Sequence, residues 1–350
     1  MRIILHTLLV IVGMPWLASG QTMAAIQSDH TIKTTVEFVT LDAQVLNKKT
    51  GRTIGSLRRE DFRLFEDGVE QQITFFSQDT LPLSIVLLFD LTDSVRPVLK
   101  PLARGAREAL NHLKPQDEVA VMVYAAAAEL LQDFTTDREL AVAAIQKASE
   151  MKSPEPAFFN EAVFQAASQL KMAGNPQGRR VIVWLTDNVP NTPSEGVRRR
   201  LGKSVPAGSL HTESDAFRQL FKTGTVVSAL LERSMLSDVA IVALKNPMMT
   251  IFRKVNPPGD VHKYADRTGG EVMKSSKEEV SSKLAELIDQ IRTRYSLGYT
   301  PSVKKPAGTF CQIRLQVSPD VEKREGHLIV RTKQGYYRQE AAEIDTPVAR

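Results

Sequence analysis

The sequence predicts an α/β protein in which a doubly wound, mainly parallel β-sheet is inserted in a β-sandwich built from the N- and C-terminal flanks. Residues 83–293 alternate continuous apolar runs with amphipathic patterns, as expected for a parallel sheet covered by helices on both faces. The flanks, residues 31–80 and 294–340, instead alternate apolar and polar residues, as half-buried strands do. Because neither flank has enough strands to bury a core alone, we expect the two to pair with each other.

The N-terminal flank, residues 31–80, reads as a strand followed by a hairpin. Apolar and polar residues alternate through "TTVEFVTLDAQVLN", and "KKTGRTIG" then supplies a turn. The stretch "DFRLFEDGVEQQITFFSQ" predicts two strands joined at Asp67-Gly68, a dipeptide that favours tight hairpin turns.

The α/β part, residues 81–293, begins with a change of pattern at Leu83. Four apolar runs predict buried strands: "SIVLLF", "DEVAVMVYA", "RRVIVWLTD" and "TVVSALLE". "AELLQDF" is expected to be the antiparallel neighbour of the second run. We expect helices at about 98–111 and in "DRELAVAAIQKAS", "NEAVFQAASQLKMA" and "KEEVSSKLAELIDQIRTRY". "DVHKYADRTGGEVMKS" predicts a short helix, a glycine stop and a strand.

The C-terminal flank, residues 294–340, returns to strand patterns in "YSLGYTP", "TFCQIRLQVS" and "GHLIVRTKQGYY". Residues 190–222 and 233–260 have no clear assignment. The stretch "SDVAIVALKNPMMTIFRKV" is more apolar than a loop, and Asn246-Pro247 would break a helix there. It is interpreted either as an extra helix packed on the domain or as a surface that faces a partner.

The first 20 residues have the layout of a bacterial signal peptide. Arg2 precedes a short apolar run, and the small residues Ala18 and Gly20 suit a cleavage site near Gln21. The alternative is a membrane anchor, but the run is short and Pro15 interrupts it. We therefore expect a secreted or periplasmic protein with no transmembrane span in the mature chain. No cysteine lies near residue 20, so we expect no lipid anchor.

Charge and cysteine content exclude several classes of protein. The net charge of +5 is mild for 350 residues and no basic stripe is present, so we expect no nucleic-acid partner. The densest basic run, "VRRRLGK", reads as a solvated face. The chain has one cysteine, Cys311, and so has no internal disulfide. Cys311 lies in an alternating stretch and is interpreted as a half-buried strand residue rather than a reactive thiol.

Polar side chains follow two of the predicted strands. Asp90, Thr92 and Ser94 come directly after "SIVLLF", and Asp187 ends "RRVIVWLTD". If these strands are neighbours, the four side chains meet at the carboxyl edge of the sheet, where open α/β sheets bind ligands. All four offer hard oxygen atoms, which Mg²⁺, Mn²⁺ and Ca²⁺ prefer, whereas Zn²⁺ would favour His or Cys. The alternative is that Asp90 and Thr92 only cap the next helix.

These residues resemble the metal-ion-dependent adhesion site of von Willebrand factor type A domains. That family has D-x-S-x-S after its first strand, a Thr in a second loop, and an Asp after its fourth strand. "DLTDS" matches with Thr for the first Ser, and "VIVWLTDN" matches with Asn188 in place of the usual Gly. Over residues 31–340 the chain resembles the von Willebrand factor A-related proteins of acidobacteria, which have similar "DFRLFEDG" and "YSLGY…GYY" segments around the domain.

The resemblance implies a divalent cation, Mg²⁺ or else Mn²⁺ or Ca²⁺, with Thr92 and Ser94 as direct ligands. Asp90 and Asp187 would act mostly through water, and a partner's carboxylate would complete the coordination. One departure weakens the site, because Ala157 in "SPEPAFFNEAV" stands where the second-loop Thr is expected. Asn160 or Glu161 would have to compensate; otherwise they simply begin a helix.

Three functions remain open on the sequence. The resemblance implies an exported interaction protein that binds a protein or cell-surface ligand through the cation. Ser94, Asp187 and His262 occur in the order of a hydrolase triad, but no Gly-x-Ser-x-Gly elbow surrounds Ser94, so we do not expect an enzyme. The third possibility is a metal-free structural or assembly module.

Overall fold

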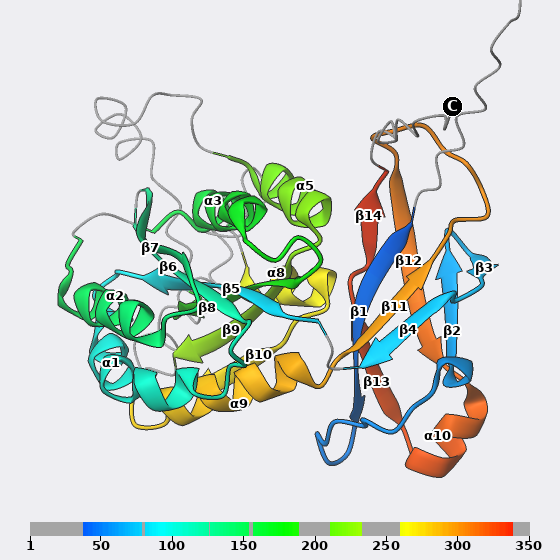
Figure 1. The fold of residues 1–350 in the computed structure, drawn as a ribbon, viewed down its shortest axis with the longest axis horizontal. Helices are drawn as coiled ribbons and strands as arrows, with labels where there is room; N and C mark the ends of the chain where they lie inside the picture. The colour runs from blue at the N-terminus through cyan, green and yellow to red at the C-terminus, as the bar shows by residue number, and fades with distance from the viewer. Residues whose placement is uncertain are drawn as a thin grey trace, which may run out of the picture. The chain divides into compact units, whose positions relative to one another are not determined.

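In the computed structural model, a six-stranded sheet with strand order β10-β9-β8-β5-β6-β7 runs through the α/β part (Figure 1). Neighbouring strands are parallel except for β7, which runs antiparallel to β6. The structure describes residues 38–78, 81–125, 127–153, 157–188, 211–232 and 260–338, all within one compact unit. The strands of this sheet are β5 (Leu83–Asp90), β6 (Glu118–Tyr124), β7 (Ala128–Thr135), β8 (Arg179–Thr186), β9 (Val226–Glu232) and β10 (Val272–Ser275).

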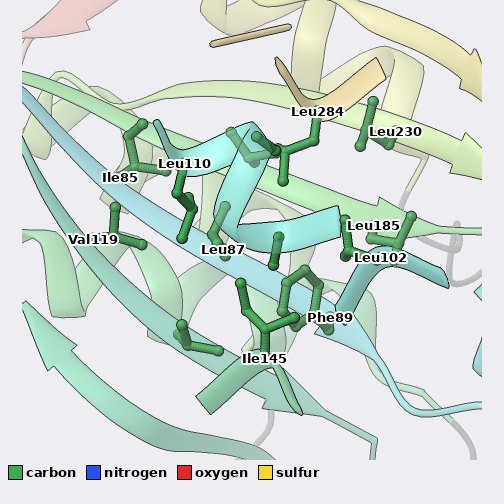
Figure 2. Packing of buried hydrophobic residues seen from close by; sticks show 14 of the residues in the cluster. Ile85, Leu87, Phe89, Leu102, Leu110, Val119, Ile145, Leu185, Leu230 and Leu284 are labelled. Carbon is green, nitrogen blue, oxygen red and sulfur yellow. The ribbon is translucent and has the colours of Figure 1, made fainter. Parts of the chain in front are cut away.

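Helices cover both faces of this sheet, as the continuous apolar strands predict (Figure 1). Alternate residues of β5 enter separate cores. Leu87 and Phe89 pack with α1, α2 and α9, as Figure 2 shows, whereas Leu88 faces α3, α5 and α8. The helices are α1 (Arg96–Leu110), α2 (Arg138–Glu150), α3 (Phe159–Gln169), α5 (Glu213–Thr223), α8 (Val261–Thr268) and α9 (Val280–Arg292).

The two flanks pair with each other in two four-stranded sheets, β13-β1-β11-β4 and β14-β12-β2-β3. Strand β1 lies between β11 and β13, so its neighbours on both sides come from the other end of the chain. The apolar faces of these sheets enclose a third core, which includes Leu64 and Tyr295. These strands are β1 (Val39–Asn47), β2 (Phe62–Glu66), β3 (Val69–Gln71), β4 (Phe75–Gln78), β11 (Tyr295–Tyr299), β12 (Phe310–Val317), β13 (Leu328–Thr332) and β14 (Gly335–Tyr337).

The predicted fold class is confirmed, with two helices that the sequence patterns did not indicate. Helix α5 lies in the unassigned stretch 190–222, and its N-terminus is capped by Thr212 and Asp215. Helix α10 (Pro319–Glu325) interrupts the C-terminal strands and is too short for helical periodicity to reveal. The expected signal peptide and most of the second unassigned stretch lie outside the described residues, so both interpretations stay predictions.

Candidate metal centre

The two predicted acidic residues lie at the ends of neighbouring strands. Asp90 is the last residue of β5 and Asp187 follows β8, which pairs with β5 in parallel. The chain continues from β5 through β6 to β7 on one side and returns to β8 on the other. The carboxyl ends of β5 and β8 therefore lie at the topological switch point, where doubly wound sheets bind their ligands.

The hydroxyl groups of the loop after β5 converge on Asp187. Ser94 Oγ donates to Asp187 Oδ2 at 2.5 Å, and Thr92 Oγ1 lies 3.2 Å from Ser94 Oγ. Neighbouring ligands of an octahedral Mg²⁺ ion lie about 3 Å apart, because each oxygen is about 2.1 Å from the metal. The two hydroxyl oxygens thus have a spacing that suits one cation, and an Asp187 oxygen is next to them.

The helix-cap interpretation of Asp90 and Thr92 is wrong for the side chains. Helix α1 begins at Arg96 and has no side-chain cap; its first turn is closed by the backbone carbonyl of Thr92, which accepts from Val95 N and Arg96 N. Asp90 Oδ1 accepts from the backbone N–H of Thr92 at 2.8 Å, which bends the loop rather than capping the helix. The loop hydroxyls are therefore not needed to begin α1.

Asp90 is completely buried and held by several donors. Beside the Thr92 N–H, the Tyr124 hydroxyl donates to Asp90 Oδ2 at 3.0 Å. Burial raises the pKa of Asp90 to about 6, the negative charge of Asp187 adds to this rise, and the hydrogen bonds from Thr92 and Tyr124 oppose it. A divalent cation nearby would relieve the repulsion between the two carboxylates.

The sequence interpretation missed two aromatic residues that hold Asp90 in place through hydrogen bonds. Trp184 Nε1 donates to the Tyr124 hydroxyl at 2.8 Å, so a chain of hydrogen bonds leads from β8 through β6 to the carboxylate on β5. Tyr124 and Trp184 are buried, and burial raises the pKa of Tyr124 well above its usual range, with the Asp90 charge adding to the rise. A tyrosine that ends the strand next to Asp90, in register with it, was the available signal.

Both proposed substitutes for the missing hydroxyl are engaged by residues other than the four of the candidate site. Ala157 is buried in the core below α3, where its methyl group offers no lone pair. Asn160 Oδ1 accepts from the Tyr264 hydroxyl at 2.8 Å, and Glu161 Oε2 accepts from His211 N at 2.9 Å. Both side chains thus serve contacts between helices.

Asn188, which replaces a glycine of the resembled motif, has a positive φ of 56°. Asparagine is one of the few side chains that adopt this left-handed conformation at moderate cost. Its Oδ1 accepts from Val261 N at 2.9 Å, which joins the end of β8 to the first turn of α8. The departure from glycine therefore leaves the loop intact and adds a helix contact.

A second group of possible metal ligands lies in the flanking sheets. Glu66, Asp67 and Cys311 place one ligand atom each within 4.8 Å of one another. Basic groups already neutralise both acids, because Arg338 donates to Glu66 at 2.9 Å and Lys305 to Asp67 at 2.6 Å. This group is therefore an ion-pair network, buried at Glu66 and exposed at Asp67, rather than a cation site.

The triad interpretation finds no support in the described residues. Ser94 donates to Asp187 directly, and no hydrogen bond in the described part of the chain joins the His262 side chain to either of them. A hydrolase triad requires the histidine between the serine and the acid.

Comparison with known proteins gives one family match. The family model described as von Willebrand factor type A domain matches residues 85–189, which include β5, β8 and all four predicted site residues. No curated protein matches the chain.

Several solved structures are similar at low identity. An aerotolerance-related membrane protein from Bacteroides fragilis is 14% identical over 59% of this chain and 99% of its own, with a TM-score of 0.36. A von Willebrand factor type A protein from Catenulispora acidiphila is 9% identical over 89% and 75%, with a TM-score of 0.42. The von Willebrand factor domain of a type V pilus tip protein from Porphyromonas gingivalis is 10% identical over 61% and 95%, with a TM-score of 0.40.

These TM-scores lie below 0.5, so the similarities carry no functional conclusion for this chain. The family match stands on its own, and the strand order and the positions of Asp90 and Asp187 agree with it. The chain therefore contains a von Willebrand factor type A domain.

Proposed function

We propose that this protein is an exported protein-interaction module that binds a carboxylate of its partner through a divalent cation, Mg²⁺ or else Mn²⁺ or Ca²⁺. Thr92 and Ser94 are the direct ligands, and Asp90 and Asp187 orient them or act through water. The cation supplies positive charge that attracts a partner's carboxylate. The partner is a protein or cell-surface ligand.

One observation carries the proposal: the Thr92 and Ser94 hydroxyls and an Asp187 oxygen meet at the switch point of the sheet. All are hard oxygen donors in the arrangement that Mg²⁺ prefers. The signal-peptide pattern of residues 1–20 supports the exported location. Within the described residues, each helix is too short or too polar to cross a membrane.

Calorimetry with matched variants tests cation binding. Asp187→Asn removes a negative charge beside the two hydroxyls. Asp93→Asn makes the same chemical change in the same loop, but the Asp93 side chain is 83% exposed and, within the described residues, its ion pair is with Arg96. We expect the wild type and Asp93→Asn to bind Mg²⁺ or Mn²⁺, and Asp187→Asn to lose at least tenfold in affinity.

Binding should also raise the melting temperature of the wild type, because a ligand that binds only the folded state stabilises it by mass action. Equal binding by Asp187→Asn and Asp93→Asn would place the cation elsewhere. Absence of heat and of any thermal shift with Mg²⁺, Mn²⁺ and Ca²⁺ in the wild type would refute the metal proposal.

A pulldown from cell-envelope extract tests the interaction itself. We expect a bound protein in the presence of Mg²⁺ that is lost with a chelator and with Asp187→Asn, and kept with Asp93→Asn. Capture that is indifferent to chelator and to both variants would favour the second candidate, a metal-free assembly module. The buried Ala157, which removes one expected ligand, is the observation that favours this alternative.

A further inference from the structure

A cavity of about 390 Å³ opens at the end of the sheet opposite to the metal centre. Arg179 and Val226, which begin β8 and β9, form one wall, and Asp42 of β1 and Ser296 of β11 form another. This volume lies in the range of small-molecule sites and is far below what a folded partner would need.

The cavity wall carries more positive charge than its acid can neutralise. Arg179, Arg180 and Lys333 line it, and among the described residues Asp42 is the one acidic residue that lines it. Arg179 and Asp42 form an ion pair at 3.1 Å, so these two charges offset each other. Arg180 donates only to the carbonyls of Thr223 and Pro176, and its Nε is buried without a hydrogen-bond partner in the described structure. Neither Arg180 nor Lys333 therefore forms an ion pair with a carboxylate of the described part of the chain.

Lys333 is the less well accommodated of the two. No described residue forms a hydrogen bond or an ion pair with its ammonium, which lies 5.8 Å from the centroid of the Tyr336 ring. Lys333 is partly exposed; desolvation lowers the pKa of Lys333 to about 8, and the Asp42 charge opposes this shift. A cation at a cavity wall with no carboxylate partner among the described residues is available to pair with an anionic ligand.

The backbone that carries Lys333 is held tightly in place. It runs against Gly269, the left-handed residue that ends α8, with a φ of 81°. A Cβ atom on Gly269 would lie 2.4 Å from the carbonyl carbon of Thr332 and 2.8 Å from Lys333 N. Only glycine permits this approach, so the start of the Lys333 side chain is positioned before any ligand binds.

Part of the remaining wall is apolar. Phe38 and Phe75 form an edge-to-face pair with ring centroids 6.4 Å apart, and Leu41 and Leu81 line the cavity with them. The two phenylalanine residues are among the large apolar side chains that the described structure leaves exposed. A ligand with an apolar body would cover them.

We propose that this cavity binds a small organic anion, a carboxylate with an apolar or aromatic body, with Lys333 as its counter-ion and Arg180 as a second donor. The ligand's body contacts the Phe38–Phe75 pair. The site is separate from the metal centre, so its occupancy does not depend on the cation.

Binding of 3-phenylpropionate and of its neutral amide, 3-phenylpropanamide, to the full mature chain tests this proposal by calorimetry and saturation-transfer NMR. We expect saturable binding of the carboxylate and at least tenfold weaker binding of the amide, because a charge-assisted hydrogen bond is lost. Lys333→Met should weaken carboxylate binding at least tenfold. Lys274→Met, which makes the same change on the exposed face of β10, should leave it unchanged.

A second measurement separates a ligand-binding lysine from a structural one. Since no residue in the described ranges forms an ion pair with Lys333, we expect Lys333→Met to unfold in urea at the wild-type concentration or above. A marked loss of stability would give Lys333 a structural role and overturn the assignment. Arg180→Met, which removes the second donor, should weaken carboxylate binding several-fold, and unchanged binding by this variant would also overturn the proposal. The proposal is also overturned if the wild type does not bind the carboxylate, if the amide binds equally well, or if inorganic phosphate alone binds.

Discussion

Both oxygens of Asp90 already accept a hydrogen bond. One oxygen accepts from Thr92 N and the other from the Tyr124 hydroxyl, and the side chain is completely buried. Its charge instead acts through the residues it orients, because a buried carboxylate keeps much of its electrostatic effect over a few ångströms. Thr92 and Ser94, which are partly exposed, are better placed to contact a metal.

Ala157 permits a test of whether one hydroxyl limits the affinity for Mg²⁺. We expect Ala157→Thr to bind Mg²⁺ at least tenfold more tightly than the wild type, because it adds a direct oxygen ligand. The buried site has little space, so the larger side chain should lower the free energy of unfolding by about 1–3 kcal/mol. Calorimetry and urea unfolding measure the two effects.

The matched control is Ala157→Val, which has the shape of threonine without its oxygen. It should show a similar loss of stability and no gain in Mg²⁺ affinity. If Ala157→Val gains as much affinity as Ala157→Thr, the effect comes from packing and not from a ligand. If neither variant nor the wild type binds, the loop keeps the outline of the family's site without its chemistry.

At the scale of elements, the loop after β5 and the loop after β8 depend on backbone geometry for their shape. Thr92 closes the start of α1 through its backbone carbonyl, so its hydroxyl is not needed to cap the helix. Asn188 holds the β8 loop in a left-handed conformation and accepts from Val261 N at the start of α8. Asp187 lies between these constraints, so its position next to Ser94 follows from the two elements that flank it.

Substitutions of Asn188 should separate backbone strain from the lost contact with α8. Asn188→Ala and Asn188→Gly both remove the acceptor for Val261 N, but only alanine is strained at a φ of 56°. We expect Asn188→Gly to be more stable than Asn188→Ala by about 1 kcal/mol in urea unfolding. Equal stability of the two variants would mean that the loop relaxes to a negative φ.

At the scale of the whole molecule, Arg179 joins the α/β part to the flanking strands. It begins β8 and is almost completely buried. Its guanidinium forms an ion pair with Asp42 of β1 at 3.1 Å and donates to Ser296 Oγ of β11 at 2.9 Å and to the carbonyl of Arg294 at 2.7 Å. The strand that ends at Asp187 thus begins in a network shared with both flanks.

Loss of the Arg179 network should lower the free energy of unfolding more than the same substitution at the neighbouring Arg180. We expect Arg179→Met to lower the free energy of unfolding by about 3 kcal/mol, because it leaves Asp42 without its partner and several buried acceptors unsatisfied. Arg180→Met removes an arginine with only two long contacts to carbonyls and should cost much less. Similar losses for both variants in urea unfolding would contradict this role for Arg179.

The sequence by itself determined the fold class, most strands and helices, and the four residues of the candidate site. Hydrophobic periodicity and turn dipeptides are local, so "SIVLLF" and Asp67-Gly68 identified a buried strand and a hairpin without knowledge of their neighbours. Two acidic residues at strand ends predicted a shared crevice, because parallel strands end at one edge of a sheet. Helix α10 was missed because seven residues are too few for a period to emerge.

Only the tertiary structure decided what surrounds these residues. The hydrogen bonds from Trp184 to Tyr124 and from Tyr124 to Asp90 join positions 60 and 34 residues apart, and the pair between Arg179 and Asp42 spans 137. Such partners depend on strand order and register, which no local pattern encodes. The cavity beside Lys333 likewise emerges only when distant segments meet, because its lining comes from residues 38 to 333 and its charge balance is a property of the folded chain.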